Sequence, residues 1–538
     1  MASFLRLVLG HPFSQILLTA LLLVAAMPGL LGWWPLVFFA LVPLLRLTLV
    51  QPPRRCALYG LAAGCIHYLI LLYWIVIVLG RYGGLPLALS LFALVLLSLY
   101  MALYVGAFFG LVSYLVGGYW HHERSGIPLL VWSAPIVWVG LEWLRGRLFT
   151  GLPWMDLGYA LYGCPKLIQA ADLGGHYLIS FCIVLTNSLL VGMIANGTDK
   201  DRRSKLCSAG RKVMLFACCV LVFLSGYSFT RYRQVKMGLR RSLQAGITVV
   251  QGNIAQDAKW TPAWRQKTVQ TYIELSQKAL ARNISELVVW PETALPFYPT
   301  SSALFGDVLN LARKENIFLL AGSPWAEPAD GTRGAGNGLS GPEKVRYYNS
   351  ALLITPEGRL VRRVDKQHLV PFGEYVPLRG LLPFLEPLVE NIGDFTAGTS
   401  ALPLEAGRIR AGVLICFETI FPEIARTWVQ NGANLLVVLT NDAWYGRSSA
   451  PYHSLAMSVF RAVETRRSLV RAANTGISAL VDPLGDILCE SKLFVSSYLS
   501  ATLPLTSERT LFVRLGHNFG AVCFALILPL ILYRRATA

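Results

Sequence analysis

Residues 413–418 read VLICFE, three aliphatic residues followed by Cys416, Phe417 and Glu418. A short apolar run that ends in polar residues is typical of a buried β-strand whose end lies at a site on the edge of a sheet. Similar runs occur at Ile247–Val250, Leu287–Trp290, Ile317–Ala321, Ala351–Ile354, Leu435–Leu439 and Ser478–Val481. Helical patterns with an apolar face alternate with them, at Pro262–Arg282, Ser302–Lys314, Phe421–Gln430 and His453–Arg467. We therefore predict an α/β domain of layered sheets over residues 245–505.

The chain as a whole is too apolar for a water-soluble protein. Hydrophobic residues make up 54% of the sequence and charged residues 14%, and the mean hydropathy is +0.51. A bilayer core needs about 20 apolar residues per helix, and such runs lie near residues 13–30, 34–50, 57–79, 86–117, 127–144, 177–195, 212–230 and 511–533. We expect about eight transmembrane helices, with the first seven in residues 1–235 and the last at 511–533.

The basic residues fit a membrane protein better than a nucleic-acid-binding one. The net charge is +18, but the excess forms no stripe on a nucleic-acid module, so no nucleic-acid partner is expected. If the N-terminus is cytoplasmic, the inner segments are the basic ones. They carry Arg6, Arg46, Arg54, Arg55, Arg124, Lys200, Arg202, Arg203, Lys205, Arg211, Lys212, Arg534 and Arg535.

This charge pattern also predicts the topology. It favours one helix over residues 86–117, because a break there would reverse every later span. The first apolar run is expected to be a retained helix, since no convincing cleavage site follows it. Both termini then lie in the cytoplasm, and residues 245–505 lie outside the membrane.

Three polar residues stand where buried strands are expected to end. Glu292 follows LVVWP, Lys366 opens KQHLVPFGE, and Cys416 ends VLIC. Together these side chains can attack an amide or ester carbonyl: the thiol is the nucleophile, the carboxylate takes its proton, and the ammonium stabilises negative charge. A carboxylate is a weak base for a thiol, so Glu292 would need an apolar enclosure such as Trp290 and Pro291.

The motifs WPETALP (290–296), KQHLVPFGE (366–374) and ICFE (415–418) resemble those of the nitrilase or carbon-nitrogen hydrolase superfamily. That resemblance implies an α-β-β-α sandwich. With the membrane helices and TGLPW (150–154), VQGNI (250–254), HLVPFGEYVP (368–377) and NDAWYG (441–446), the whole chain resembles the apolipoprotein N-acyltransferase family.

The family resemblance assigns roles to the three polar residues. It implies that Cys416 is the nucleophile, Glu292 the general base, and Lys366 the group that stabilises the thiolate and the oxyanion. It also implies supporting carboxylates at Glu374 and Glu418.

Substrate-binding positions are implied by the same resemblance. Trp260 and Asn349 match positions near the acyl chain or the wall of the site. Phe417 stands where some relatives have a tyrosine, so that hydroxyl has no role here. No metal and no cofactor are expected.

The resemblance further implies a reaction and a place for it. A fatty acyl chain leaves a phospholipid, usually phosphatidylethanolamine, forms a thioester with the cysteine, and passes to the N-terminal amine of a diacylglyceryl-cysteine lipoprotein. The enzyme would be a monomer in the bacterial inner membrane, with its catalytic domain in the periplasm. A site outside the cytoplasm has no acyl-CoA, so a lipid donor is also reasonable on physical grounds.

Other interpretations remain open from the residues alone. Cys416 could be a core cysteine or form a disulfide with Cys489 or Cys164, and Glu292 could cap a helix. The same triad could serve a membrane-tethered amidase, and an inactive domain of this type could belong to a transporter.

Further polar residues have alternatives of their own. His368, His453 and Asn441 could suggest a Cys-His mechanism, although structural hydrogen bonds in turns are expected for them. Glu142 and Arg145 are expected either to form an ion pair or to meet a lipid headgroup. Residues Leu378–Leu388 are apolar enough to act as a lid at the membrane interface.

Overall fold

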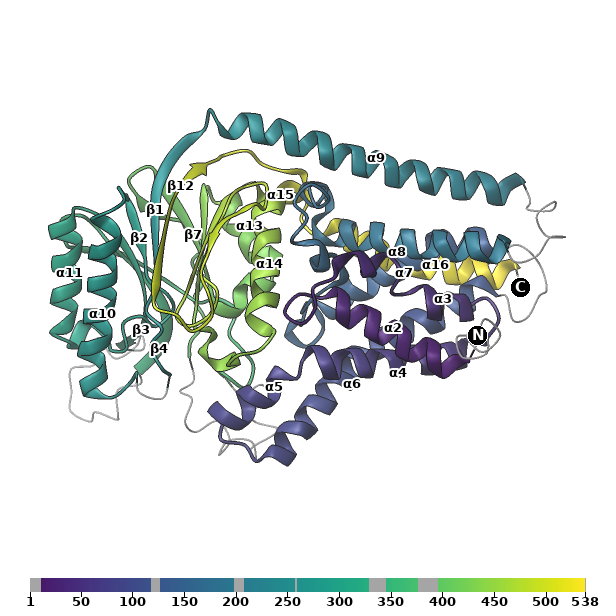
Figure 1. Cartoon of the computed structure of the whole chain (residues 1–538), viewed down its shortest axis with the longest axis horizontal. Helices are drawn as coiled ribbons and strands as arrows, with labels where there is room; N and C mark the ends of the chain where they lie inside the picture. The colour runs from purple at the N-terminus through teal and green to yellow at the C-terminus, as the bar shows by residue number, and fades with distance from the viewer. Residues whose placement is uncertain are drawn as a thin grey trace, which may run out of the picture. The chain divides into compact units, whose positions relative to one another are not determined.

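The computed structural model describes residues 11–117, 126–197, 208–256, 259–328, 345–375 and 395–537. The predicted lid at Leu378–Leu388 lies outside these residues. The chain forms two compact units (Figure 1). We call them the helical unit, Met1–Lys236 with Ser448–Glu464 and Thr510–Ala538, and the sheet unit, Met237–Arg447 with Thr465–Arg509.

Long apolar helices dominate the helical unit. The five that are long and apolar enough to cross a bilayer are α6 (Leu87–Val116), α7 (Gly126–Arg145), α8 (Ala171–Gly197), α9 (Ser208–Leu239) and α16 (Asn518–Thr537). The shorter elements are α2 (Pro12–Ala26), η1 (Trp34–Phe38), α3 (Val42–Leu47), α4 (Pro53–Leu71), α5 (Trp74–Ile77), η2 (Val78–Tyr82), η3 (Leu148–Thr150), η4 (Leu157–Leu161), α14 (Ala450–Thr465) and α15 (Leu511–Leu515).

The expected number of eight spans is not confirmed. The described residues hold five candidate spans, or six if α4 and the helical turns at Trp74–Tyr82 form one span bent by 47°. The first two predicted runs fold as the shorter α2 and as η1 with α3, because prolines and glycines at Pro28, Gly29 and Pro43 interrupt them. The run at 86–117 is a single helix, α6, as predicted.

Small residues let α4 and α6 approach each other closely. A Cβ on Gly60 would lie 2.6 Å from the Phe109 ring, and one on Gly64 would lie 3.0 Å from the Cα of Ala102. Glycines four residues apart are a common means of packing membrane helices, where van der Waals contact replaces the hydrophobic effect. The sequence GLAAG at 60–64 thus determines this helix pair.

Two six-stranded sheets form the sheet unit. One has the order β12-β1-β2-β3-β4-β5 and the other β11-β10-β9-β8-β7-β6. The first contains β1 (Leu243–Gln251), β2 (Leu287–Val289), β3 (Phe318–Pro328), β4 (Val345–Ile354), β5 (Leu360–Asp365) and β12 (Ser497–Leu505). The second contains β6 (Leu404–Ala406), β7 (Ile409–Ile415), β8 (Leu435–Thr440), β9 (Ser468–Ala473), β10 (Ala479–Val481) and β11 (Ile487–Glu490).

The central strands β1–β2–β3 and β7–β8–β9 run parallel, and antiparallel strands flank them. The helices α10 (Pro262–Leu280) and α11 (Leu304–Glu315) lie side by side along the first sheet, and α13 (Pro422–Gln430) contacts β7 of the second (Figure 1). Because β1 also contacts β9, the two sheets pack against each other, and the layers follow the order helix, sheet, sheet, helix.

Every strand predicted from an apolar run is present, and β5, β6, β9, β11 and β12 were missed. Four of the missed strands include exposed or partly exposed residues, and the fifth, β9, is fully buried but has its apolar run interrupted by Arg471. Of the strands that carry the site, β2 is fully apolar because both of its faces are covered, whereas β5 contains Arg362 and Arg363. No residue of β2 or of β8 is exposed.

Candidate active site

Cys416 follows the last residue of β7 and begins the 3-10 turn η7 (Cys416–Ile420). Its φ is +56°, a left-handed conformation that costs a non-glycine residue about 1 kcal/mol or more. The turn directs the side chain out of the sheet, and Cys416 keeps partial exposure while Ile415 and Glu418 are buried. The geometry suits a thiol that must meet a substrate.

Glu292 lies three residues beyond β2 and is 7% exposed. Its Oε1 accepts a hydrogen bond from Asn349 Nδ2 at 2.7 Å, and its Oε2 accepts one from the backbone N–H of Asn441 at 2.8 Å. The negative charge of this carboxylate also acts on the Cys416 thiol. The turn can lie this close to β3 only because residue 322 is glycine: a Cβ there would lie 2.6 Å from the Cα of Glu292.

Lys366 follows β5 directly and is 1% exposed. Its Nζ lies 2.8 Å from a carboxylate oxygen of Glu374, and its backbone N–H donates to the carbonyl of Asn349 at 2.8 Å. The Asn349 amide donates to Glu374 at 3.2 Å as well as to Glu292. Asn349, on β4, therefore connects the two carboxylates that flank the ammonium.

The electrostatics of these groups determine where the thiol proton can go. Burial raises the pKa of the Cys416 thiol, and the nearby Glu292 carboxylate raises it further. Burial alone would lower the pKa of Lys366, but the carboxylate of Glu374 and the charges of Cys416 and Glu292 raise it instead. At neutral pH the cysteine is thus a thiol and the lysine an ammonium.

Burial also raises the pKa of Glu292, against the opposing effect of Lys366. Its carboxylate therefore has a greater proton affinity than in water, and its charge acts on the thiol of Cys416. Glu292 is therefore placed to accept the proton of Cys416. Its burial meets the need for an enclosed carboxylate that the sequence analysis stated. Trp290 is fully buried and stacks on Tyr272 with ring centroids 5.1 Å apart.

Glu418 joins the turn that begins at Cys416 to the segment that begins at Lys366. Its Oε1 accepts from the backbone N–H groups of Gln367 at 2.6 Å and His368 at 3.0 Å, and its Oε2 accepts from Ile415 N–H at 2.7 Å. Burial raises the pKa of the Glu418 carboxyl to about 7, while these three donors favour its charged form. The Glu418 carboxylate thus binds the backbone just before Cys416 and the backbone just after Lys366. It makes no hydrogen bond to the thiol among those of the described residues.

We expect Glu418→Gln to lower the free energy of unfolding by about 1–3 kcal/mol and to slow alkylation of Cys416 by iodoacetamide. The side-chain NH₂ of glutamine would face one of the three backbone N–H groups, and two donors cannot hydrogen-bond to each other. Thermal unfolding and peptide mass analysis would measure the two effects. Glu405→Gln, an exposed position on β6, is the matched control and should change neither. A Glu418→Gln protein as stable and as reactive as the wild type would contradict this role.

The predicted substrate-binding residues lie in different surroundings. Asn349 is buried within the site, as described above. Phe417 follows the nucleophile, and its ring lies 5.3 Å from that of Phe421 and 6.1 Å from that of His368. Trp260 is 43% exposed and precedes α10, so it presents its ring at the surface of the sheet unit.

Several groups that hold the site were not chosen as site residues from the sequence. Asn441 was expected to be a structural residue, and this is confirmed: its backbone holds Glu292, and its side chain donates to Gln256 at 2.7 Å. Asn474 donates to the side chain of Asn441 at 3.1 Å and to the carbonyl of Ile254 at 2.8 Å. The polar segments NDAWYG and AANTG after strands were the available signals.

The alternative uses of the cysteines and histidines find no support. Cys416, Cys489 and Cys164 are free thiols. The His368 ring packs against Phe421 with centroids 3.9 Å apart, and burial lowers its pKa. His453 belongs to the helical unit, where it accepts a hydrogen bond from Trp154 at 3.3 Å. The charges that act on the Cys416 thiol are those of Glu292, Lys366 and Asp442.

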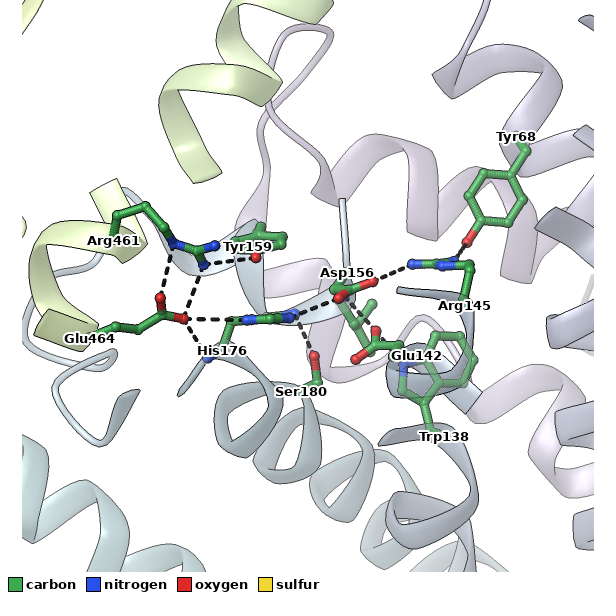
Figure 2. Close-up of polar contacts among 12 residues, drawn as sticks. Tyr68, Trp138, Glu142, Arg145, Asp156, Tyr159, His176, Ser180, Arg461 and Glu464 are labelled. Carbon is green, nitrogen blue, oxygen red and sulfur yellow. Dashed lines mark hydrogen bonds and ion pairs between the residues drawn. The ribbon is translucent and has the colours of Figure 1, made fainter. Parts of the chain in front are cut away.

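A second cluster of ionisable residues lies inside the helical unit (Figure 2). We call it the buried charge network, and it consists of Glu142, Arg145, Asp156, His176, Arg461 and Glu464. The Nε2 of His176 lies 2.8 Å from Asp156 and its Nδ1 3.3 Å from Glu464, so the imidazole bridges two carboxylates. Arg461 pairs with Glu464 at 2.9 Å.

The other end of this network involves the two charges noted on α7. Arg145 forms an ion pair with Asp156 and donates to the Tyr68 hydroxyl. Glu142 accepts hydrogen bonds from Trp138 Nε1 at 2.7 Å and from Leu157 N–H at 2.8 Å. The structural ion pair expected for Arg145 is therefore present, but its partner is Asp156 and not Glu142.

Two family models match the chain. Residues 19–189 match the apolipoprotein N-acyltransferase N-terminal domain, and residues 246–511 match the carbon-nitrogen hydrolase domain. A carbon-nitrogen hydrolase fold joined to membrane helices is thus the class of protein. Among solved structures, Saccharomyces cerevisiae Nit3, a member of branch 10 of the nitrilase superfamily, is similar to part of the chain (20% identity, 48% of this chain and 90% of that one, TM-score 0.36).

Relatives with similarity over nearly the whole length give the family. The apolipoprotein N-acyltransferase of Geobacter metallireducens is 40% identical over 95% of this chain and 93% of its own. The protein of that name from Methylococcus capsulatus is 31% identical over 90% of both chains, and that from Vibrio cholerae is 29% identical over 89% and 88%. The chain belongs to the apolipoprotein N-acyltransferase family.

Proposed function

We propose that this protein transfers a fatty acyl chain from a membrane phospholipid, through a thioester on Cys416, to the N-terminal amine of the diacylglyceryl-cysteine of apolipoproteins. This would be the last step of bacterial lipoprotein maturation. The observation that carries the proposal is the meeting of a thiol, an enclosed carboxylate and a buried ammonium at the strand ends. Membership of the acyltransferase family supplies the direction of the chemistry.

The first half-reaction forms the thioester. Glu292 takes the thiol proton as the sulfur of Cys416 attacks the ester carbonyl of the phospholipid. The Lys366 ammonium stabilises the developing thiolate and the oxyanion. When the tetrahedral intermediate collapses, the ester C–O bond breaks, and Glu292 returns the proton to the departing lysophospholipid. The Asn349 amide and Asn441 N–H hold the carboxylate in place for both transfers.

The second half-reaction uses the same groups in reverse order. The lipoprotein amine, in its neutral form, attacks the thioester carbonyl, and its proton passes to Glu292. The C–S bond breaks, the product amide leaves, and the proton returns to the Cys416 sulfur. Glu374 is expected to keep Lys366 charged throughout, because its carboxylate lies 2.8 Å from the ammonium. Trp260 and Phe417 are proposed to line the path of the acyl chain.

The reaction requires a particular placement in the cell. We propose that residues 1–235 and 511–533 lie in the bacterial inner membrane, with both termini in the cytoplasm, and that residues 245–505 form the catalytic domain in the periplasm. The acyl donor then comes from the bilayer and the acceptor from lipoproteins anchored in it. The protein is expected to act as a monomer.

The decisive test is intact-mass analysis of the purified protein with phosphatidylethanolamine, followed by a diacylated lipopeptide. We expect a hydroxylamine-labile acyl adduct on the wild type, none on Cys416→Ser, and discharge of the adduct as N-acylated peptide. The absence of an adduct, with release of ammonia from small amides, would instead support an amidohydrolase that uses the same triad.

A further inference from the structure

Lys259 is a buried cation that the mechanism above does not use. It lies between β1 and α10, is 0% exposed, and precedes the exposed Trp260. Its Nζ donates to the Thr293 hydroxyl at 2.7 Å. Thr293 is the residue next to Glu292, so the lysine touches the turn that carries the general base.

Burying an ammonium is costly, with a penalty of several kcal/mol for an isolated charge. Among the described residues, Thr293 provides the hydrogen bond that the ammonium makes. Burial lowers the pKa of Lys259 to about 7, although the Glu292 carboxylate opposes this decrease. A methionine of similar length would fill the space without this cost, which points to a role for the charge itself.

The backbone conformation of Thr293 indicates what its hydrogen bond to Lys259 does. Its φ is +47°, in the left-handed region, which is unusual for a β-branched residue. Such a conformation persists only where the surroundings hold it. The Lys259 bond fixes the side chain of Thr293, and the backbone N–H of Ala294 bonds to Pro291 at 3.2 Å. Glu292 lies between these two anchors.

We propose that Lys259 is a positioning residue for the general base: through Thr293 it holds the turn that orients Glu292, and it places a second positive charge near that carboxylate. The proposal rests on the proposed function only for its catalytic consequence. The charged and titratable groups near Glu292 are then Lys366, Glu374, Cys416, Tyr445 and Lys259. Lys366 neutralises Glu374, to which it is bonded, and Lys259 helps to keep Glu292 ionised.

The sign of the effect follows from this arrangement. A nearby cation favours the carboxylate, so removing the Lys259 charge raises the proton affinity of Glu292. The fraction of Glu292 able to accept the thiol proton then falls at neutral and lower pH. The acidic limb of any reaction that needs this base moves to higher pH.

The test compares full-length wild type and Lys259→Met in two assays. The first is alkylation of Cys416 by iodoacetamide as a function of pH, read by peptide mass, which needs no assumption about the natural substrate. The second is acyl transfer from phosphatidylethanolamine to a diacylated lipopeptide. We expect the acidic limb of alkylation to move up by about one pH unit. In transfer, kcat should fall on the order of tenfold with little change in KM.

The unfolding temperature distinguishes positioning from structural support. It should stay the same or rise in Lys259→Met, because the buried charge is gone. Lys278→Met, at an exposed position on α10, is the matched control and should leave all three measurements unchanged. Two results for Lys259→Met would overturn the proposal. One is an unshifted acidic limb of alkylation together with a wild-type kcat, and the other is a lower unfolding temperature without a shift of that limb.

A second pair of variants covers the case in which Lys259→Met does not fold. Thr293→Val removes the acceptor, so the buried Lys259 favours its neutral form and the shifted limb should be reproduced, whereas Thr293→Ser keeps the hydroxyl and should not shift it. A limb that is unshifted in Thr293→Val overturns the proposal. If the wild type forms no acyl adduct, the proposed function fails, but the alkylation assay still decides the role of Lys259.

Discussion

Replacing Cys416 with alanine is expected to abolish acyl transfer, with a loss of about 10⁴-fold or more in turnover. The proposed reaction passes through a bond to sulfur, and no other thiol lies against Glu292 and Lys366 among the described residues. Single-turnover transfer of a labelled acyl chain to a lipopeptide measures the loss. The fold should survive, because the side chain is partly exposed and only the sulfur is removed.

Cys489→Ala is the matched control for this variant. Cys489 is also a free, half-buried thiol of the second sheet, on β11, away from the strand ends that carry the site. Its loss should leave transfer within about twofold of the wild type. Substantial transfer by Cys416→Ala would show that the acyl chain passes directly from lipid to amine, without a thioester.

Asp156→Asn should be the most destabilising single change in the helical unit, with a decrease of about 3–5 kcal/mol in the free energy of unfolding. The Asp156 carboxylate faces Arg145 on one side and His176 on the other, and all three side chains are 4% exposed or less. Removing the negative charge leaves the buried Arg145 without its counter-charge and leaves His176 with Glu464 as its carboxylate partner. Thermal unfolding in detergent would show the effect as a lower midpoint.

An exposed ion pair provides the comparison for this prediction. Glu286 and Arg408 pair at the surface of the sheet unit, where their side chains are 36% and 47% exposed. Glu286→Gln should cost no more than about 1 kcal/mol, because water and salt screen such pairs. If Asp156→Asn were as mild as Glu286→Gln, the buried charge network would not contribute to the stability of the helical unit.

The buried charge network also shows how segments from distant parts of the chain form one unit. His176 on α8 binds Glu464 on α14, 288 residues later in the sequence. Both the backbone N–H and the ring of His176 contact the same carboxylate, at 2.9 and 3.3 Å. Although α14 connects β8 to β9 in the sequence, all but its last residue groups with the membrane helices.

The sequence by itself determined the character of both units. Apolar runs of bilayer length predicted a membrane protein, and short buried runs predicted the central strands, because burial on both faces leaves no place for polar residues. The positions of Glu292, Lys366 and Cys416 at the ends of expected strands, where α/β enzymes place polar working groups, also came from the local sequence, although β2 and β5 belong to one sheet and β7 to the other. Local patterns are sufficient for such features.

Only the tertiary structure decided how the site is held and how the network is paired. The Asn441 N–H that binds Glu292 is a backbone group, which leaves no trace in residue identity. In the sequence nothing distinguishes Lys259 from an ordinary surface lysine, but in the fold it is buried against Thr293. Arg145 forms an ion pair with Asp156 and not with Glu142, although Glu142 lies only one helical turn away from it on α7. These contacts depend on the directions of side chains from separate segments, which periodicity and composition do not specify.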